Sequence, residues 1–278
     1  MCTVGQLVYT LPGGEPVLGV TSLAGEIYLL RDKASEQVEV YDVINFRFRL
    51  KRCLTVPNAG DFHDITSCEH NRCVYIGDPV VQCVHRLDVQ GAFTRWAVND
   101  SPQGLSVNAA HNVIVACPDV RKIKEYDTHG KLKGELTLPN KVLNPWHVIQ
   151  TRNGDFVVCH GNAGDPVHRV CMINADDRDI VHSHGRERGS DTGQYNLPLH
   201  LAVDDNEFVF VADRDNRRVT LLSPTLEHLR QVVIGNQLKW WPSRLHLFVH
   251  QQQRLLCVAD NERKDDKYTA GRAVIFRV

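Results

Sequence analysis

The sequence of 278 residues lacks long apolar runs, and none approaches the roughly 18 residues that a membrane-spanning helix needs. Residues Met1 to Thr10 contain no basic segment followed by an apolar core, so no export signal is expected. Sustained helical periodicity is also missing. These absences predict a β-rich monomer with no membrane partner and a cytoplasmic location.

An excess of charge of either sign is absent as well. Lysine and arginine total 32 against 33 aspartates and glutamates, which leaves a formal net charge of −1. A balance of this kind excludes a whole-molecule attraction to nucleic acid or to an anionic membrane. Only a local basic patch could provide such an attraction.

Paired cysteines and zinc-finger spacings are missing too. The nine cysteines occur singly, for example within the apolar segments 73–76 and 256–258, and none forms a CxxC pair. Unpaired cysteines in apolar segments behave as small hydrophobic residues. We therefore expect reduced, buried cysteines, and no RING, B-box or coiled coil.

What the sequence does contain is a sixfold repeat. Six mutually similar apolar segments end at residues 32, 78, 117, 160, 213 and 260, and we call these last positions the marker residues. Their spacing of 39 to 53 residues is typical of the four-stranded blade of a β-propeller. The predicted fold is all-β, a single six-bladed propeller domain over residues 1–278. The expected blades are 12–57, 58–100, 101–140, 141–185, 186–236, and 237–278 together with 1–11.

The two ends of the chain carry incomplete parts of this repeat. The last copy stops after its third strand, at residues 271–278, and an isolated strand-like segment lies at residues 4–10. Pairing of these two segments would complete one blade and remove the free edge of the ring.

One copy of the repeat carries a family pattern. The segment GQYNLPLHLAVD at residues 193–204, followed by VADRDNRRV at residues 211–219, resembles an NHL repeat. The chain is similar to the NHL propeller that ends tripartite-motif (TRIM) proteins and to stand-alone invertebrate relatives. The resemblance implies an NHL-type propeller whose loop-bearing face binds protein or RNA. Without the zinc-binding modules, ubiquitin-ligase activity is not implied.

The marker residues predict architecture in most blades. Aspartate recurs at Asp32, Asp78, Asp213 and Asp260, and repetition together with the nearby Arg217 and Arg218 favours hydrogen-bonded pairs within blades. Cys117 and His160 depart from this pattern, and a departure from symmetry is typical of a functional site.

Histidines recur at the start of four predicted innermost strands, at His63, His147, His200 and His246. Neutral imidazoles that converge on the axis could bind zinc or another divalent transition metal, with His63, His147 and His246 coming from alternate blades. The alternative interpretation is that they are hydrogen-bonded channel residues without a metal.

A second, local resemblance concerns the segment His63-Asp64-Ile65, which is similar to a metal-binding segment of peptidylglycine amidating lyase. It implies that Asp64 assists a metal site. No match for the catalytic tyrosine of that lyase is found.

Further candidates for binding lie on the loops. Trp146 beside His147, with His160 at the next turn, could form a ligand pocket, unless the indole only fills space between blades. Arg214, Arg217 and Arg218 with the aromatic segment 239–244 have the composition of a single-strand RNA surface, although neighbouring aspartates oppose it.

The leading hypothesis is an interaction module that binds a protein, peptide or RNA ligand at the mouth of the central channel. The expected ligand-binding residues are His63, Trp146, His147, His160, His200, Arg214 and Arg244. The alternative is a metal-dependent lyase or hydrolase with zinc or another divalent metal as cofactor. Its expected ligands are His63, His147, His200, His246 and Asp64. The sequence leaves open whether the protein is an enzyme.

Overall fold

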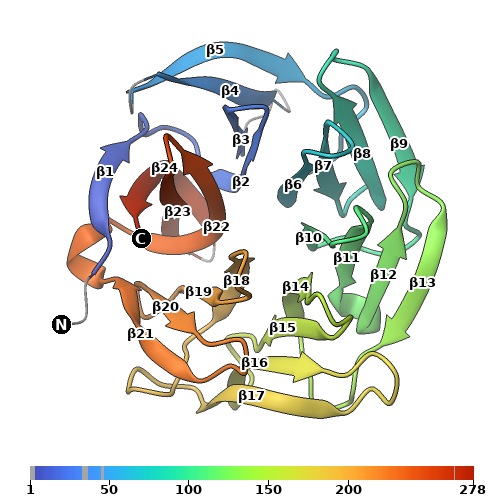
Figure 1. Ribbon diagram of the computed structural model, residues 1–278, viewed down its shortest axis with the longest axis vertical. Helices are drawn as coiled ribbons and strands as arrows, with labels where there is room; N and C mark the ends of the chain where they lie inside the picture. Colours follow the sequence, from blue (N-terminus) through green and yellow to red (C-terminus); the bar gives the residue numbers. More distant parts are fainter. Residues whose placement is uncertain (1–3, 33–36, 45–46, 266) are drawn as a thin grey trace.

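Six four-stranded sheets form a ring around a central axis in the computed structural model (Figure 1). The structure describes residues 4–32, 37–44, 47–265 and 267–278. Within those residues the helical elements are two short 3₁₀ turns, η1 (Pro118–Val120) and η2 (Gly235–Gln237). None of the helices described is long and apolar enough to span a membrane. The predicted all-β, six-bladed propeller is confirmed.

Each sheet is one blade, and its first strand along the chain lies nearest the axis in blades 1 to 5, while β22 takes that place in blade 6. Blade 1 contains β2 (Val17–Leu23), β3 (Glu26–Arg31), β4 (Gln37–Ile44) and β5 (Arg47–Thr55). Blade 2 contains β6 (Asp64–Cys68), β7 (Cys73–Asp78), β8 (Cys83–Asp88) and β9 (Phe93–Ala97). Blade 3 contains β10 (Gly104–Val107), β11 (Val113–Cys117), β12 (Lys122–Tyr126) and β13 (Leu132–Thr137).

The second half of the chain repeats this order. Blade 4 contains β14 (Pro145–Gln150), β15 (Phe156–His160), β16 (Val167–Ile173) and β17 (Ile180–Glu187). Blade 5 contains β18 (Pro198–Val203), β19 (Val209–Asp213), β20 (Arg218–Leu222) and β21 (His228–Val233). Because β17 extends to Glu187, the predicted blade boundary at residue 185 falls inside a strand.

Blade 6 is built from both ends of the chain. It contains β22 (Trp241–His250), β23 (Gln253–Lys264), β24 (Lys267–Arg277) and, as its outermost strand, β1 (Gln6–Thr10). Strand β1 pairs antiparallel with β24, from Gln6 opposite Arg277 to Thr10 opposite Val274. The predicted closure of the ring is confirmed, and it covers an edge that would otherwise be free to pair.

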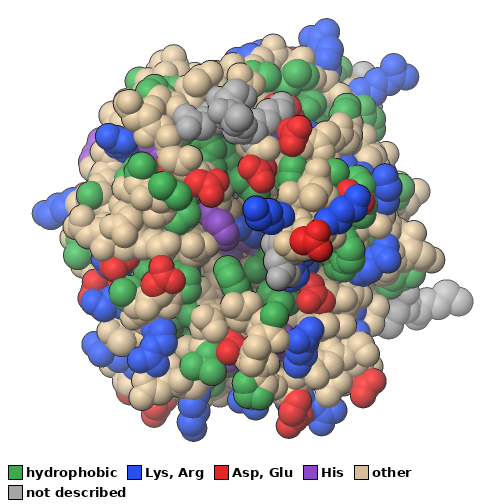
Figure 2. Space-filling view, turned by 180° about the vertical axis from the view of Figure 1, so that it is seen from behind, with side chains coloured by type: hydrophobic (Ala, Val, Ile, Leu, Met, Phe, Trp, Pro, Cys, Tyr) green, Lys and Arg blue, Asp and Glu red, His purple; other side chains and the backbone are tan. Residues whose placement is uncertain are grey.

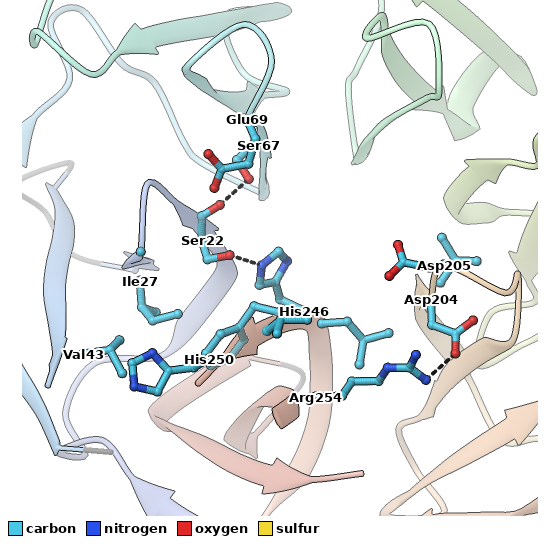
Figure 3. A pocket seen from close by; sticks show the side chains of 15 residues that line it. Ser22, Ile27, Val43, Ser67, Glu69, Asp204, Asp205, His246, His250 and Arg254 are labelled. Carbon is cyan, nitrogen blue, oxygen red and sulfur yellow. Dashed lines mark hydrogen bonds and ion pairs between the residues drawn. The ribbon is translucent and has the colours of Figure 1, made fainter. Parts of the chain in front are cut away.

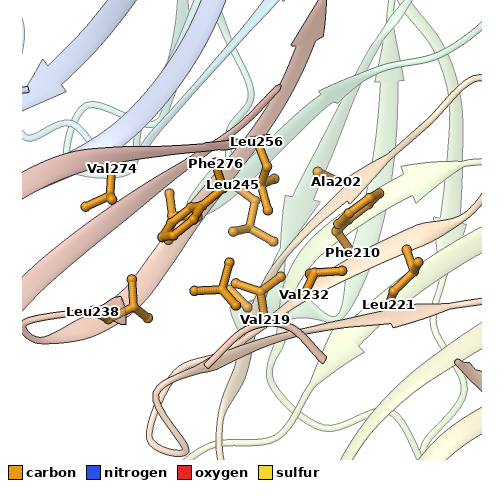
Figure 4. Packing of buried hydrophobic residues seen from close by; sticks show 13 residues of the cluster. Ala202, Phe210, Val219, Leu221, Val232, Leu238, Leu245, Leu256, Val274 and Phe276 are labelled. Atoms are coloured by element: carbon orange, nitrogen blue, oxygen red, sulfur yellow. The ribbon is translucent and has the colours of Figure 1, made fainter. Parts of the chain in front are cut away.

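The second strand of each blade has an apolar central stretch because both of its faces are buried there. In β11, Val113, Val115 and Cys117 pack toward blade 2, whereas Ile114 and Ala116 pack toward blade 4. Six buried clusters fill the six spaces between neighbouring blades, and Figure 4 shows the one between blades 5 and 6. Two-sided burial therefore produced the repeat that the sequence displays.

The marker residues hold the loops that lead into the innermost strands. The carboxylate of Asp78 accepts the backbone N–H groups of Gly60 and Asp61, and the carboxylate of Asp260 accepts those of Lys239 and Trp240. Asp213 accepts the N–H of Asn196 and pairs with Arg218 at 2.7 Å. These aspartates are structural, as the sequence predicted.

Blade 1 requires a correction. Register places Arg31, and not Asp32, at the marker position, because Arg31 lies opposite Val17 as Asp213 lies opposite Pro198. The charges are reversed there: Arg31 donates to the carbonyl oxygens of the preceding loop and pairs with Glu39 at 2.9 Å.

The described cysteines are all free, and seven of these eight are buried, as expected. Cys53 on the outer strand β5 is exposed, which corrects the expectation for that residue. Cys2 lies outside the described residues.

Candidate functional site

Register defines one equivalent position in every innermost strand, opposite the residue that precedes the marker. These six positions form what we call the axial ring: Gly19, Asp64, Gly104, His147, His200 and Arg244. The ring combines a carboxylate, a guanidinium, two imidazoles and two glycines at the centre of the molecule. Four of the six blades therefore direct a polar side chain to one level of the channel.

Asp64 is the hub of the axial ring. Its side chain is buried, and its Oδ2 accepts the backbone N–H of Leu105 at 2.9 Å. The same oxygen lies 3.6 Å from Nε2 of His200 and 3.8 Å from Nε2 of His147, while Oδ1 lies 3.3 Å from Nε of Arg244. Burial alone would raise the pKa of this carboxyl, but His200 and the Arg244 guanidinium hold it well below its usual range.

The two histidines of the ring stack on each other with ring centroids 3.7 Å apart. Nε2 of His147 donates to the carbonyl oxygen of Leu105 at 3.0 Å, and Nδ1 of His200 accepts the N–H of Leu245 at 3.3 Å. Burial lowers the pKa of His147 to about 3 and also lowers that of His200. Both imidazoles are therefore neutral at neutral pH, which is the form that binds metals.

These three residues form a potential metal-binding group. Their ligand atoms on Asp64, His147 and His200 all lie within 4.8 Å of one another. Oδ1 of Asp64 and Nδ1 of His147 are buried without a hydrogen-bond partner in the described part of the chain. An ionised carboxylate with two neutral imidazoles is a donor set suited to zinc. The Arg244 guanidinium opposes metal binding, because this positive charge already neutralises Asp64.

His63 lies beside the ring and not in it. Its Nδ1 donates to the carbonyl oxygen of Gln103 at 3.0 Å, and Arg244 donates to the His63 carbonyl oxygen at 2.7 Å. Burial, followed by the charge of Arg244, lowers the pKa of His63 to about 4. His63 and Arg244 together form the floor of a pocket that opens on one face.

This opening, which we call the mouth pocket, has a volume of about 440 Å³. Among the predicted residues it contains His63, Trp146, Arg214 and Arg244. The Trp146 indole donates to the carbonyl oxygen of Gly161 at 3.0 Å and packs against the core between blades 4 and 5. Its remaining surface faces the pocket, so it both fills space and lines a cavity. Figure 2 shows this face, with a hollow at its centre that contains a histidine side chain.

Two predicted histidines lie elsewhere. His160 is buried inside blade 4, where its Nε2 lies 3.4 Å from Sγ of Cys171, and it does not line the mouth pocket. His246 is two residues beyond Arg244 in β22 and bonds through Nε2 to Oγ of Ser22 at 2.8 Å. The predicted set of His63, His147 and His246 is therefore not the group that converges among the described residues, because the register of β22 brings Arg244 to the axis.

The predicted basic surface is largely occupied by the chain itself. Arg217 donates to the carbonyl oxygens of Leu238, Lys239 and Trp240. Arg218 is bound by Asp213, and Arg214 pairs with Asp215 at 2.8 Å. Arg217 and Arg218 therefore fix loops and are not free to bind phosphates, while Arg214 also lines the mouth pocket.

The channel also opens on the opposite face, into a pocket of about 350 Å³ (Figure 3). His246 points toward Ser22 at its floor, and the carbonyl oxygen of Ser22 accepts a hydrogen bond from Ser67 at 2.7 Å. Asp204 pairs with Arg254 at its rim at 2.6 Å. The polar atoms at this floor are thus already bonded to one another.

Several residues of the mouth pocket were not predicted. Asp32, Asp61, Lys267 and Tyr268 line its walls. Asp61 lies in the loop before an innermost strand, Asp32 directly follows β3, and Lys267 and Tyr268 begin β24. Nothing in a single sequence distinguishes these residues from other charged or polar residues on the protein surface.

Comparisons with known proteins place the fold. Neither a protein-family model nor a curated protein matches the chain. A catalytically inactive virginiamycin B lyase from Staphylococcus aureus, solved with quinupristin, is 11% identical, with 97% of this chain and 96% of that chain covered and a TM-score of 0.62. Hydrazine synthase of Kuenenia stuttgartiensis is 12% identical, with 100% and 98% covered and a TM-score of 0.62. A protein of unknown function from Bacteroides caccae is 14% identical, with 83% and 85% covered and a TM-score of 0.60.

The likeness shows the propeller fold alone. At identities this low, a shared fold does not carry an activity from one protein to another. The NHL type of the repeat has no family-model match, and it stays a prediction.

Proposed function

We propose that the protein is a recognition module that binds a peptide segment of a protein partner in the mouth pocket. The observation that carries this proposal is an open cavity of about 440 Å³ above the axial ring, which is large enough for a few residues of an extended chain. Its floor contains the buried Arg244, and its wall contains Arg214, with Trp146 and Tyr268 adding aromatic surface. Rigid aromatic and arginine side chains are typical of protein recognition sites.

A peptide is favoured over RNA by the charges around the cavity. Asp32 and Asp61 stand at its rim and repel phosphates, while Arg217 and Arg218 of the neighbouring loop are bound by backbone carbonyl oxygens and by Asp213. Affinity for single-stranded RNA depends on free basic groups that track the phosphates. The mouth pocket offers no continuous track of that kind among its described residues.

Recognition is also favoured over covalent catalysis. The described residues that line the mouth pocket include one serine and no threonine or cysteine; this serine, Ser243, is buried, donates to the carbonyl oxygen of Ala259 and accepts from Asn261. A nucleophilic mechanism needs a base within hydrogen-bond reach of the nucleophile.

The test is to select phage-displayed heptapeptides on the full chain and to measure their affinity by fluorescence polarisation. Ala163 is exposed on the pocket wall, so Ala163→Trp should fill the cavity and weaken the selected peptides by at least about tenfold. Ala97→Trp, at an exposed position of β9, should leave affinity unchanged. Equal binding to Ala163→Trp, or capture of an RNA 12-mer at physiological salt when no peptide is selected, would overturn the proposal.

A second candidate is a metal-dependent lyase or hydrolase, favoured by the convergence of Asp64, His147 and His200. These residues would hold zinc or another divalent transition metal, which supplies Lewis-acid chemistry when bound. After dialysis against chelator, titration with CoCl₂ should give one equivalent of tetrahedral absorption in the wild type and none in His147→Ala. Arg244→Met should bind Co²⁺ more tightly, because the competing guanidinium is gone. No uptake by either protein would leave recognition as the function.

A further inference from the structure

The charged residues of the mouth pocket are sorted by sign between two pairs of blades. Asp32 and Asp61 come from the loops of blades 1 and 2, whereas Arg214 and Lys267 come from blades 5 and 6. Figure 2 shows both acidic side chains and lysine or arginine side chains around the central hollow. A pocket for a purely anionic or a purely cationic ligand would not be divided in this way.

The acidic wall lacks an internal counter-ion. Within the part of the chain that the structure describes, neither Asp32 nor Asp61 forms an ion pair, whereas Asp78 nearby accepts backbone N–H groups and Asp64 pairs with Arg244. Burial raises the pKa of the Asp61 carboxyl, and the neighbouring carboxylates of Asp32 and Asp78 raise it further. A cationic group from a ligand would relieve this repulsion.

The basic wall has a complementary property. The ammonium of Lys267 has no ion-pair partner among the described residues, and it stands at the start of β24 where the hairpin opens onto the pocket. The buried Arg214 keeps its charge through Asp215 and lies in the same wall. An anionic group from a ligand would find a free cation there.

We propose that the bound segment is dipolar. A lysine or arginine side chain of the partner lies against Asp32 and Asp61, and an aspartate or glutamate side chain of the same segment lies against Lys267 and Arg214. The residues between the two charges occupy the floor over His63 and Arg244. This inference rests on the proposed function, and it adds the chemical class of the segment.

The same charges disfavour peptide segments whose side chains are all acidic or all basic. An all-acidic segment would meet Asp32 and Asp61, and an all-basic segment would meet Lys267 and Arg214. Exposed ion pairs are weak in water, so each correct charge should improve affinity only about threefold.

The test uses four matched libraries of blocked pentapeptides with randomised central residues. Their ends carry lysine and glutamate, lysine and glutamine, glutamine and glutamate, or two glutamines. The best lysine–glutamate binders should be about threefold tighter than the singly charged series and about tenfold tighter than the neutral one. Added sodium chloride should reduce these differences in affinity, because salt screens the charges.

Two substitutions at exposed positions test which wall of the pocket meets which charge of the peptide. Asp61→Asn should abolish the advantage of the peptide lysine, and Lys267→Gln should abolish the advantage of the peptide glutamate. Arg152→Gln, at an exposed turn between β14 and β15, should change neither. Equal affinities across the four libraries, with loss of binding in Ala163→Trp, would overturn the dipolar inference and keep the proposed function. Equal binding to Ala163→Trp would overturn both.

Discussion

Leu105 connects the two halves of the axial ring through its backbone. Its N–H donates to Asp64 of blade 2, and its carbonyl oxygen accepts from His147 of blade 4. Both side chains can converge on blade 3 because the ring position of that blade is Gly104, beside Leu105. A Cβ at Gly104 would overlap the carbonyl oxygen of Trp146 and lie 3.0 Å from Cα of His147. The glycine therefore permits the close approach on which the site depends.

Substitution Gly104→Ala should lower the free energy of unfolding by about 2 kcal/mol, because backbone atoms of blade 4 must shift to accept the methyl group. Urea denaturation at neutral pH measures this change. Gly134→Ala is a matched control, since the nearest atom to its added Cβ is a side-chain oxygen 3.8 Å away. Equal stability of the two variants would contradict the close approach described here.

Asp64 and Arg244 form a buried ion pair in the axial ring. Both residues are buried, so removal of one partner leaves the other charge without compensation. We expect Asp64→Asn to lower the free energy of unfolding by about 3–5 kcal/mol. The double variant with Arg244→Met should lose much less than the sum of the two single variants, and additive losses in urea denaturation would argue against coupling.

The elements of the fold were predictable where burial is two-sided. Strands such as β11 and β15 are apolar up to the marker position because each packs between two neighbouring blades, so five of the six marker residues were placed correctly. The exception is Arg31, whose reversed charge pairs with Glu39 in place of the aspartate pattern. A pattern of residue types cannot identify a position that performs the same task with the opposite charge.

The members of the axial ring could not all be predicted, because hairpin lengths differ between blades. Twelve residues separate Gly19 from Arg31, whereas sixteen separate Arg244 from Asp260. A histidine at a similar distance from the marker, such as His246, therefore occupies a different level of the channel. A shift of register also changes the side to which a strand residue points. Spacing thus found His147 and His200 but substituted His246 for Arg244.

Among the strands, β1 should be essential because its pairing with β24 closes the ring. Deletion of residues 1–10 would expose the backbone of β24 along its paired length and remove the bond from the Gly5 N–H to the Val232 carbonyl oxygen. We expect a lower midpoint of thermal unfolding and concentration-dependent association in size-exclusion chromatography. Leu7→Ser, at an exposed position that keeps the backbone pairing, should behave as the wild type. A deletion variant that stays monomeric with an unchanged midpoint would show that closure is dispensable.

On the scale of the whole molecule, the two faces differ in what they offer. The pocket around His246, Ser22 and Ser67 has a floor whose polar atoms bond to one another, and its Asp204 is paired with Arg254. The mouth pocket instead presents Asp61 and Lys267 without internal partners among the described residues. A ring of similar blades thus becomes a binding surface on one face through its loops, while the strands stay nearly equivalent.

The buried histidines should make the molecule sensitive to acid well before its carboxylates protonate. Burial lowers the pKa of His147 to about 3 and that of His160 and His246 to about 4, whereas an unfolded histidine titrates near about 6.5. Because the folded values are depressed, the stability that these residues contribute is complete above pH of about 6.5 and is lost as the pH falls toward about 4.

Each such histidine should contribute a slope of up to about 1.4 kcal/mol per pH unit in that window, measured as the free energy of unfolding in urea at successive pH values. The carboxylate of Glu26 has a pKa lowered to about 2 by Arg52 and Lys51, so its contribution is lost only at lower pH. His160→Gln should reduce this slope by the contribution of one histidine, because glutamine cannot take up the proton that the unfolded histidine binds. His129→Gln, at an exposed turn, should leave the slope unchanged. Stability independent of pH between 6.5 and 4.5 would contradict burial of these imidazoles in their neutral form, and with it the packing around the channel on which the site is built.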